Sequence, residues 1–407
     1  MLDARYLDAV SDEVVKLYAR LEHDIKLDMA RRLTTLSSIT DATEYQTEML
    51  RQIGGLKKAV KDLTNKTNSE AEKLMKDIFK GALKTSGEKD LKYFSASKRK
   101  LTDNQKQVLT ASLQRFQSAD KRFLKESSND LYKKTVLSLK SMTNGLINSS
   151  QNVFLQEANN AYFKTVTGAF SYQSAYKTAV DNLCTNGVNA VIYSTSGKPR
   201  KYSVESAVRM NLITGIGQAS AEQSLNNCET LGDDLVEVSA HMGARETDNP
   251  PNPWSNHTEW QGQIYCLNGE RDYIDAEGVT HHARNFYECC GYGEVDGICG
   301  VNCRHSFYPY LEGTPALFDE NDVEKLNSEL VSYNGEKMTV YDAEQKLRQC
   351  ERNIRKYKTQ SECQLVIGAD NAKSNELVKK WQATAKDLCS QTGIKREYYR
   401  EYVGARK

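Results

Sequence analysis

No proline of this 407-residue chain precedes Pro199, so nothing in the long first part of the sequence need interrupt a helix. The six prolines are Pro199, Pro250, Pro251, Pro253, Pro309 and Pro315. Proline has no backbone N–H and its ring clashes with the preceding turn, so it kinks or ends a helix. The distribution therefore predicts long helices in the first part of the chain and more irregular structure in the second.

Apolar residues before about residue 165 recur every three or four positions, which is the spacing of one helix face. One such series is Leu7, Val10, Val14, Leu17, Leu21, Ile25, Met29 and Leu33. Helices are expected over residues 7–33, over 45–63, from Ser69, from Thr102 and from about 120 to 163. The start at Ser69 rests on a capping box with Glu72, and the start at Thr102 repeats that pattern. The opposite faces are charged, which is typical of an extended helical bundle or of helices that bind a partner.

The charges of the chain nearly cancel, with 55 lysine and arginine residues against 54 aspartate and glutamate residues. Proteins that coat nucleic acid usually carry a large positive excess, so this balance argues against that role. Lysine is frequent between Lys57 and Lys100, and one interpretation is a surface that contacts phosphates. Acidic residues alternate with these lysines, and no aromatic residue is spaced to stack on bases. A solvated helix face is therefore favoured.

The cysteines and the N-terminus bear on where the protein is made. The chain has ten cysteines, and none precedes Cys184. The first residues lack the pattern of a secretory signal, and no stretch approaches the roughly 20 apolar residues that span a bilayer. We therefore expect a soluble protein that is made inside a cell. Its cysteines are expected to be buried thiols or metal ligands.

The pattern of the sequence changes near Ser171. The expected elements are a strand near 188–193, a helix over 204–227, a strand at Leu235–Ser239, short strands and loops to Pro315, and helices after Phe318. Together they predict an α+β fold with a long helical N-terminal region, a compact mixed α/β central domain and a helical C-terminal tail. The corresponding domains are expected over residues 1–170, 171–316 and 317–407.

Side chains suited to chemistry are concentrated between His241 and His305, where five of the six histidines and two of the three tryptophans fall. Such a concentration marks a candidate site. Three stretches stand out: SAHMGAR at residues 239–245, HTEWQGQIY at 257–265, and GYG followed by GICGVNCRHSFYPY between 291 and 310.

The first hypothesis for these residues is a metal site, because thiolates and imidazoles suit zinc. The candidate ligands are Cys290, Cys299, Cys303 and His305, with His241 or His257 as a further ligand. The Cys-x3-Cys-x-His spacing is not that of a standard zinc finger, since no CxxC knuckle is present. Adjacent cysteines such as Cys289 and Cys290 would also point to opposite faces of a strand.

The second hypothesis is catalysis. Histidines titrate near neutral pH and arginine binds phosphate with two hydrogen bonds, as a metal-independent nuclease requires. The residues would be His241, His257 and His305 as acid and base, with Arg245 or Arg304 holding a phosphate. ADP-ribosylation is a related alternative, although no paired-glutamate ExE element of the usual type is found in the sequence.

The third hypothesis is structural, and it is the one we favour from sequence. Polar side chains buried beside a strand need hydrogen-bond partners, and the resulting networks fix the shapes of loops. The motif residues in this role would be His241, Arg245, His257, Trp260, Gly262, Asn302, Cys303, Arg304 and His305. Gly291, Gly293, Gly297 and Gly300 are expected in turns, because no Lys-Ser/Thr follows them as in a phosphate-binding loop.

The three ordered motifs resemble those of the minor capsid proteins of tailed bacteriophages, specifically the minor capsid protein 2 group, which is related to the Mu F-type head morphogenesis proteins. The resemblance runs from about Tyr172 to the C-terminus and includes the helical segments near 204–218 and 345–355. The first helices are similar in character rather than in motif. One departure is the stretch from Glu246 to Asn256, rich in proline and asparagine, where relatives often have a shorter link.

The resemblance implies a structural protein of the phage head, found in the virion or procapsid and assembled in the cytoplasm of the host bacterium. It implies association with the portal vertex and a role in head morphogenesis, head assembly and DNA packaging or delivery. The implied partners are the portal, major capsid and scaffold proteins, with packaged DNA as a further contact and several copies per head. The alternative is an enzyme carried in the head that processes nucleic acid or ADP-ribosylates through the His/Arg cluster.

Overall fold

The computed structural model describes residues 2–97, 128–186, 188–195, 198–318 and 320–404, with a few positions between 110 and 122. The chain falls into two compact units, which we describe separately. The site unit comprises Met1–Glu13, Glu72–Ser138 and Arg209–Glu329, and the helical unit comprises Val14–Ala71, Leu139–Val208 and Leu330–Lys407. The three domains proposed from the sequence follow changes in composition along the chain, and that division stays a prediction.

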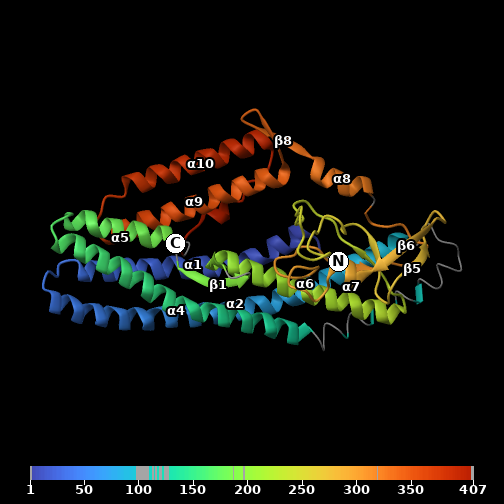
Figure 1. Cartoon of the computed structure of the whole chain (residues 1–407), viewed down its shortest axis with the longest axis horizontal. Helices are drawn as coiled ribbons and strands as arrows, with labels where there is room; N and C mark the ends of the chain where they lie inside the picture. Colours follow the sequence, from blue (N-terminus) through green and yellow to red (C-terminus); the bar gives the residue numbers. More distant parts are fainter. Residues whose placement is uncertain are drawn as a thin grey trace. The chain divides into compact units, whose positions relative to one another are not determined.

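Long helices dominate the early part of the chain (Figure 1): α1 spans Ala4–Leu36, α2 spans Ala42–Ser97 and α4 spans Ser128–Val166. The apolar series that predicted α1 is largely buried, with Leu7, Val14, Leu21, Ile25, Met29 and Leu33 all at 1% exposure or less. The helix predicted over 7–33 is therefore confirmed. The helix start predicted at Thr102 lies outside the described residues.

Helix α2 runs without interruption through Ser69, so the separate helix predicted to begin there is wrong. The buried positions of α2 continue at helical spacing on both sides of it: Leu56, Val60, Thr64, Asn68, Ala71, Met75 and Phe79. Ser69 itself is exposed. A capping box stabilises a helix start only where the backbone N–H groups are free, and here the preceding turn already occupies them.

The helical unit also holds α5 (Tyr172–Asn186) and two antiparallel hairpins, β1–β2 (Asn189–Thr195 and Lys198–Ser203) and β8–β9 (Leu330–Tyr333 and Glu336–Thr339). After β9 come α9 (Val340–Val366), α10 (Ala372–Thr392) and a short 3-10 helix at Tyr398–Glu401. Helices α9 and α10 lie along each other as a hairpin (Figure 1). The strand near 188–193 and the late helices match the predictions, whereas the β8–β9 hairpin has no counterpart among them.

The site unit is built on a five-stranded sheet in the order β5-β6-β4-β3-β7. The strands are β3 (Leu235–Val238), β4 (Ile264–Cys266), β5 (Arg271–Ile274), β6 (Thr280–Asn285) and β7 (Phe307–Pro309). The β4–β6 pair is parallel and the other pairs are antiparallel. Among the described residues this unit also holds the helices α6 (Val204–Leu231), which enters it at Arg209, α7 (Phe286–Cys290) and α8 (Glu320–Ser328).

All four residues of strand β3 are buried. Successive side chains of a strand point in opposite directions, so both faces of β3 are covered. Val236 and Val238 join Ala221 and Cys228 of α6 in one apolar cluster. Leu235 joins a second cluster with Cys266 and Tyr310. The sheet is thus packed on each side, and the predicted α+β class with its helical N-terminal region and C-terminal helices is confirmed. No helix among the described residues is both long and apolar enough to cross a membrane.

Candidate functional site

The strand order brings the three sequence motifs to one end of the sheet. Strand β3 is antiparallel to both β4 and β7, so its carboxyl end lies beside the points where β4 and β7 begin. His241 follows β3, whereas His257 precedes β4 and His305 precedes β7. Backbone hydrogen bonds continue the pairing into these segments: Ser239 donates to the Ser306 carbonyl at 2.8 Å, and Gly262 donates to the Val238 carbonyl at 3.0 Å.

Three histidines and a tryptophan pack their rings together at this end. The ring centroid of His305 lies 4.1 Å from that of His241, 4.7 Å from that of Trp260 and 5.5 Å from that of His257. His257, Trp260 and His305 are each no more than 2% exposed. Burial lowers the pKa of all three imidazoles, that of His257 to about 4, so they are neutral at physiological pH.

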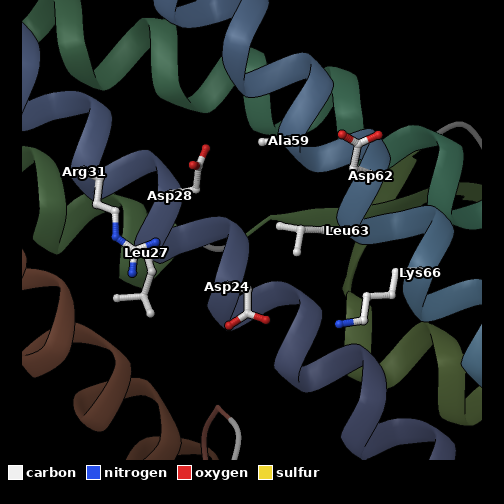
Figure 2. Close-up of a pocket in the computed structure, with 8 residues that line it drawn as sticks. All are labelled: Asp24, Leu27, Asp28, Arg31, Ala59, Asp62, Leu63 and Lys66. Atoms are coloured by element: carbon white, nitrogen blue, oxygen red, sulfur yellow. The ribbon is translucent and has the colours of Figure 1, made fainter.

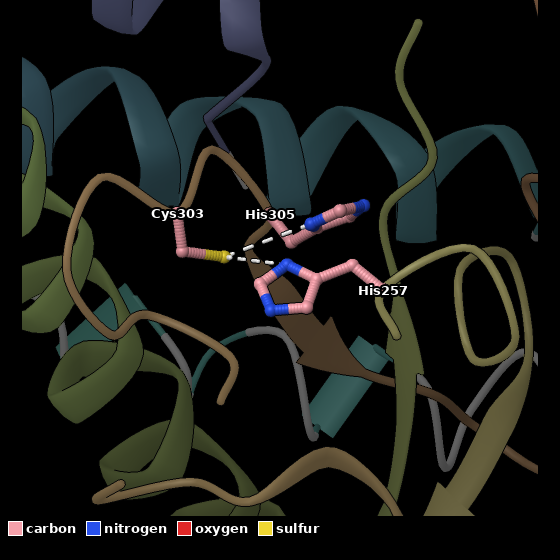
Figure 3. Close-up of side chains that lie close together, drawn as sticks. All are labelled: His257, Cys303 and His305. Atoms are coloured by element: carbon pink, nitrogen blue, oxygen red, sulfur yellow. Dashed lines mark hydrogen bonds between the residues drawn. The ribbon is translucent and has the colours of Figure 1, made fainter. Parts of the chain in front are cut away.

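His257, Cys303 and His305 form the compact group shown in Figure 3, with donor atoms within 4.8 Å of one another. The Sγ atom of Cys303 lies 3.8 Å from Nδ1 of His257 and 3.6 Å from Nδ1 of His305. The outer nitrogens of both rings have oxygen acceptors. His257 Nε2 is 2.8 Å from the Asp296 carbonyl, and His305 Nε2 is 3.2 Å from Oε1 of Gln261.

The other two cysteines of the zinc hypothesis lie in the same apolar cluster as Cys303 but outside this donor group. Cys290 and Cys299 are buried in the apolar cluster beneath the sheet, beside Phe286 and Phe307. Burial raises the pKa of both thiols well above the ordinary value, and it also raises the pKa of Cys303. The Cys299 thiol points to the His305 carbonyl, at 3.6 Å. Neither belongs to the donor group that the described residues form around Cys303.

Both arginines of the catalytic hypothesis make contacts within the protein. Arg245 donates to the carbonyls of Asp296 and Val301, at 3.0 and 3.3 Å. Arg304 binds Oδ1 of Asp8 on α1 through Nε and Nη2, at 3.2 and 3.1 Å. These contacts tie loops and the first helix to the site, and they engage part of the hydrogen-bond donors of each guanidinium.

The motif positions Asn302 and Gly262 have backbone conformations that explain their identities. Asn302 has a φ of 58°, a left-handed conformation that asparagine tolerates, and its N–H donates to Oγ1 of Thr214 on α6. Gly262 has a φ of 71°. A Cβ atom there would also lie 2.6 Å from Cγ2 of Val323, so this position requires glycine on two counts.

Asp296 is the residue of this site that the sequence reasoning missed. Its carboxylate accepts hydrogen bonds from Asn252, from the indole of Trp254 and from Ser255. Burial acts to raise the pKa of this carboxyl group, but the three donors outweigh it and hold the pKa near 2. The stretch from Glu246 to Asn256, whose shape the sequence left open, is thus fixed by an aspartate about forty residues later. The sequence signal was slight, since nothing distinguishes Asp296 from other acidic residues near turns.

His281 and His282 fall in the same sequence window but lie outside the buried ring cluster. Both are exposed on β6, where His281 pairs with Asp275 at 2.7 Å and His282 pairs with Asp272 at 2.8 Å. The window therefore contains two separate sets of histidines. Those at the buried end of the sheet have the chemistry of metal ligands, and those on β6 contact surface carboxylates.

A separate hollow of about 460 Å³ lies in the helical unit between α1 and α2 (Figure 2). Its lining mixes carboxylates with basic side chains around a few apolar ones: Asp24, Leu27, Asp28, Arg31, Ala59, Asp62, Leu63 and Lys66. None of the motif residues contributes to it. The mixture of charges favours neither an anionic nor a cationic ligand.

Comparison with known proteins agrees with the motifs. A family model described as "Phage minor capsid protein 2" matches residues 2–390. A "Structural protein" of Lactococcus phage LL-H is 25% identical over 378 residues, which cover 91% of this chain and 91% of that protein. A "Structural protein" of Lactococcus phage mv4 is 30% identical over 116 residues, or 28% of this chain and 86% of that protein. No solved structure matches the chain significantly.

Proposed function

Because the chain belongs to the phage minor capsid protein 2 family and is a structural protein of the virion, we propose that it acts at the portal vertex. In this proposal it joins the procapsid during assembly in the cytoplasm of the host bacterium. It then supports head morphogenesis and the packaging or delivery of DNA. Its partners are the portal, major capsid and scaffold proteins, with several copies in each head and a further contact with the packaged DNA.

The observation that carries the proposal is the extent of the family match, which covers residues 2–390 and so includes the long helices as well as the sheet. A protein that assembles with others needs surface for contact in addition to a stable core. The buried histidine site alone offers little such surface, since His257 and His305 are 2% and 1% exposed. We therefore assign assembly contacts to the helices and a supporting role to the sheet.

Within the helical unit, the end of α4 and the turn to α5 are our candidate for the contact with the portal protein. Phe163, Val166 and Phe170 are 63%, 52% and 50% exposed there. Large apolar side chains grouped on a surface are typical of protein–protein contact sites. The near-neutral charge of the chain also suits contact with proteins more than contact with phosphate.

The experiment is a null mutation of this gene in its phage, complemented from a plasmid. We expect loss of the protein to reduce the yield of filled heads, and we expect the wild-type protein to sediment with procapsids and cross-link to the portal. Quantitative mass spectrometry of purified heads then gives the copy number. Normal heads and full infectivity without the protein would contradict the proposal.

The contact surface is tested by complementation with the double variant Phe163→Ser and Phe170→Ser. Its expected effect is loss of the cross-link to the portal with little change in the thermal stability of the purified protein. The matched control is Val295→Ser, which removes an apolar side chain that is 66% exposed in the other unit. An unchanged cross-link in the double variant would mean that the portal contacts another surface of the protein. The proposed role in assembly would not be affected by that result.

A further inference from the structure

We propose that His257, Cys303 and His305 bind one Zn²⁺ ion through Nδ1, Sγ and Nδ1, and that the ion pins together the loops that enter β4 and β7. The set differs from the ligands expected from sequence, because it leaves out Cys290 and Cys299 and takes His257 rather than His241 as the further histidine. The inference is independent of the assembly role proposed above.

The two sulfur–nitrogen distances fit a tetrahedral ion. Zinc binds a thiolate at about 2.3 Å and an imidazole nitrogen at about 2.0–2.1 Å, which at the tetrahedral angle separates sulfur from nitrogen by about 3.5 Å. The Sγ atom of Cys303 is 3.8 Å from Nδ1 of His257 and 3.6 Å from Nδ1 of His305. The two sulfur–nitrogen distances therefore need to change by only tenths of an ångström for the sulfur and each nitrogen to share one ion, and all three donor atoms lie within 4.8 Å of one another.

Hydrogen bonding at the outer nitrogens gives both rings the tautomer that a metal requires. His257 Nε2 faces the Asp296 carbonyl at 2.8 Å, and a carbonyl only accepts, so this nitrogen carries the hydrogen. His305 Nε2 faces Oε1 of Gln261. That oxygen also accepts the backbone N–H of His241 at 3.2 Å, which fixes the orientation of the amide. Each Nδ1 is thus left with a lone pair, as in metal-binding histidines held by an outer acceptor.

The alternative of a simple hydrogen-bond cluster leaves a group unsatisfied. Cys303 has one S–H hydrogen, whereas two Nδ1 lone pairs are directed at its sulfur. One imidazole would then lose its partner in a place where His257, Cys303 and His305 are 2%, 3% and 1% exposed. A buried polar atom without a partner is costly. A cation shared by a thiolate and two imidazoles satisfies all three groups.

The position of the ligands in the chain defines what the ion does. His257 lies in the loop before β4, and Cys303 and His305 lie in the segment before β7. Strands β4 and β7 are the two neighbours of β3 in the sheet, so these segments lead into the strands on either side of β3. The ion therefore cross-links segments that are 46 residues apart in sequence, at a buried position, and its fourth ligand comes from outside this group of three.

The test begins with the wild-type, full-length protein expressed in zinc-supplemented medium and dialysed without chelator. We expect one zinc per chain by inductively coupled plasma mass spectrometry. X-ray absorption should show one sulfur at about 2.3 Å together with nitrogen and oxygen neighbours at about 2.0–2.1 Å. Replacement by Co²⁺ should give the intense d–d bands of a tetrahedral site and a single thiolate charge-transfer band. These measurements need no variant, so a folding defect cannot imitate them.

Variants then identify the ligands. Cys303→Ser and His305→Asn should reduce bound zinc at least tenfold, and a strong chelator should lower the melting temperature of the wild type more than that of either variant. Cys290→Ala and Cys299→Ala are the matched controls, since they remove buried thiols of the same cluster and should keep one zinc per chain. Zinc-free wild-type protein, two or more sulfur ligands in the absorption spectrum, or loss of zinc from soluble, folded Cys290→Ala would overturn the proposal.

Discussion

The indole nitrogen of Trp254 donates a hydrogen bond to Oδ1 of Asp296 at 3.0 Å, and this contact fixes a loop that the sequence had left undefined. The same aspartate uses its carbonyl to receive His257 Nε2, so one residue both shapes the loop and orients a candidate metal ligand. Loop shape and site chemistry are therefore coupled through a single residue. Because of this coupling, the proline-rich stretch from Glu246 to Asn256 has a defined conformation beside the buried site.

Replacing Asp296 should destabilise the site unit. In Asp296→Ala the side-chain donors of Asn252, Trp254 and Ser255 lose their acceptor, and we expect a cost of about 2–4 kcal/mol in the free energy of unfolding, measured by urea denaturation. The exposed Asp248→Ala in the same loop is the control, with an expected change within about 0.5 kcal/mol. Equal stabilities of the two variants would mean that the loop is held by other contacts.

Glu237 should make the stability of the protein depend on pH near neutrality. This buried carboxyl group accepts the N–H groups of Leu317 and Phe318 at 2.8 and 2.9 Å. Burial nevertheless dominates over these bonds and raises its pKa from 4.5 to about 7. The folded state holds the proton of Glu237 more tightly than the unfolded state does. The contribution of this group to the free energy of unfolding is therefore largest below pH 4.5 and declines as the pH rises to about 7.

The size of this effect follows from the same pKa values. A rise from 4.5 to about 7 corresponds to roughly 3 kcal/mol between the two ends of that range. Glu237→Gln keeps an oxygen for the two backbone donors and removes the titration, so its unfolding free energy should vary less between pH 5 and 8 than that of the wild type. Chemical denaturation across this range measures it, with the exposed Glu277→Gln as control. A variant as pH-dependent as the wild type would contradict the assignment.

Gly297 should not tolerate a side chain. A Cβ atom at this position would lie 1.9 Å from the carbonyl oxygen of Gly291, which is backbone and has little freedom to move. We expect Gly297→Ala to lose about 3 kcal/mol or more of stability, at the upper end of overpacking effects. Gly217→Ala in α6 is the control, because nothing lies within 4 Å of the added carbon. It should gain about 0.5–1 kcal/mol, as expected for alanine in a helix interior. Thermal and urea unfolding measure whether each variant is less or more stable than the wild type.

The neighbours Gly54 and Gly55 in α2 should respond differently to the same substitution. A Cβ atom at Gly54 meets nothing within 4 Å, so Gly54→Ala should stabilise the helical unit by about 0.5–1 kcal/mol. At Gly55 the added carbon would be 2.5 Å from Nη1 of Arg32, which also donates to Oε1 of Gln52 at 3.0 Å. Gly55→Ala must displace that guanidinium and should show no gain. Identical melting temperatures for the two variants would argue against the tight contact at Gly55.

Much of the fold could be predicted because its signals are local. The spacing of Leu7 to Leu33 predicts α1, and the apolar run at Leu235 predicts β3, since helix and strand periods are properties of neighbouring residues. The same local reasoning failed at Ser69, where a capping box is a valid start signal only if the chain before it is not helical. The uninterrupted spacing of buried residues through that point was the stronger signal.

The candidate site was predictable in place but not in arrangement. The concentration of histidine and cysteine between His241 and His305 located it, and the order of the motifs identified the family. The sequence could not show which cysteine contacts the histidines, because the type of a residue does not reveal where its side chain points. Cys290, at the end of the short helix α7, and Cys303 belong to the same apolar cluster, but the thiol of Cys303 is the one that lies beside the imidazole nitrogens.

The sequence by itself therefore determined most of the long helices, the strand β3 and the residues that gather near the sheet. Only the tertiary structure decided that β3 runs antiparallel to both β4 and β7, which places His241, His257 and His305 at one end of the sheet. It also decided that the Asp296 carbonyl accepts from the His257 ring and that Gln261 accepts from the His305 ring. The physical reason is range: helical and strand periods depend on residues a few positions apart, whereas strand register and hydrogen-bond partners join segments that are tens of residues apart.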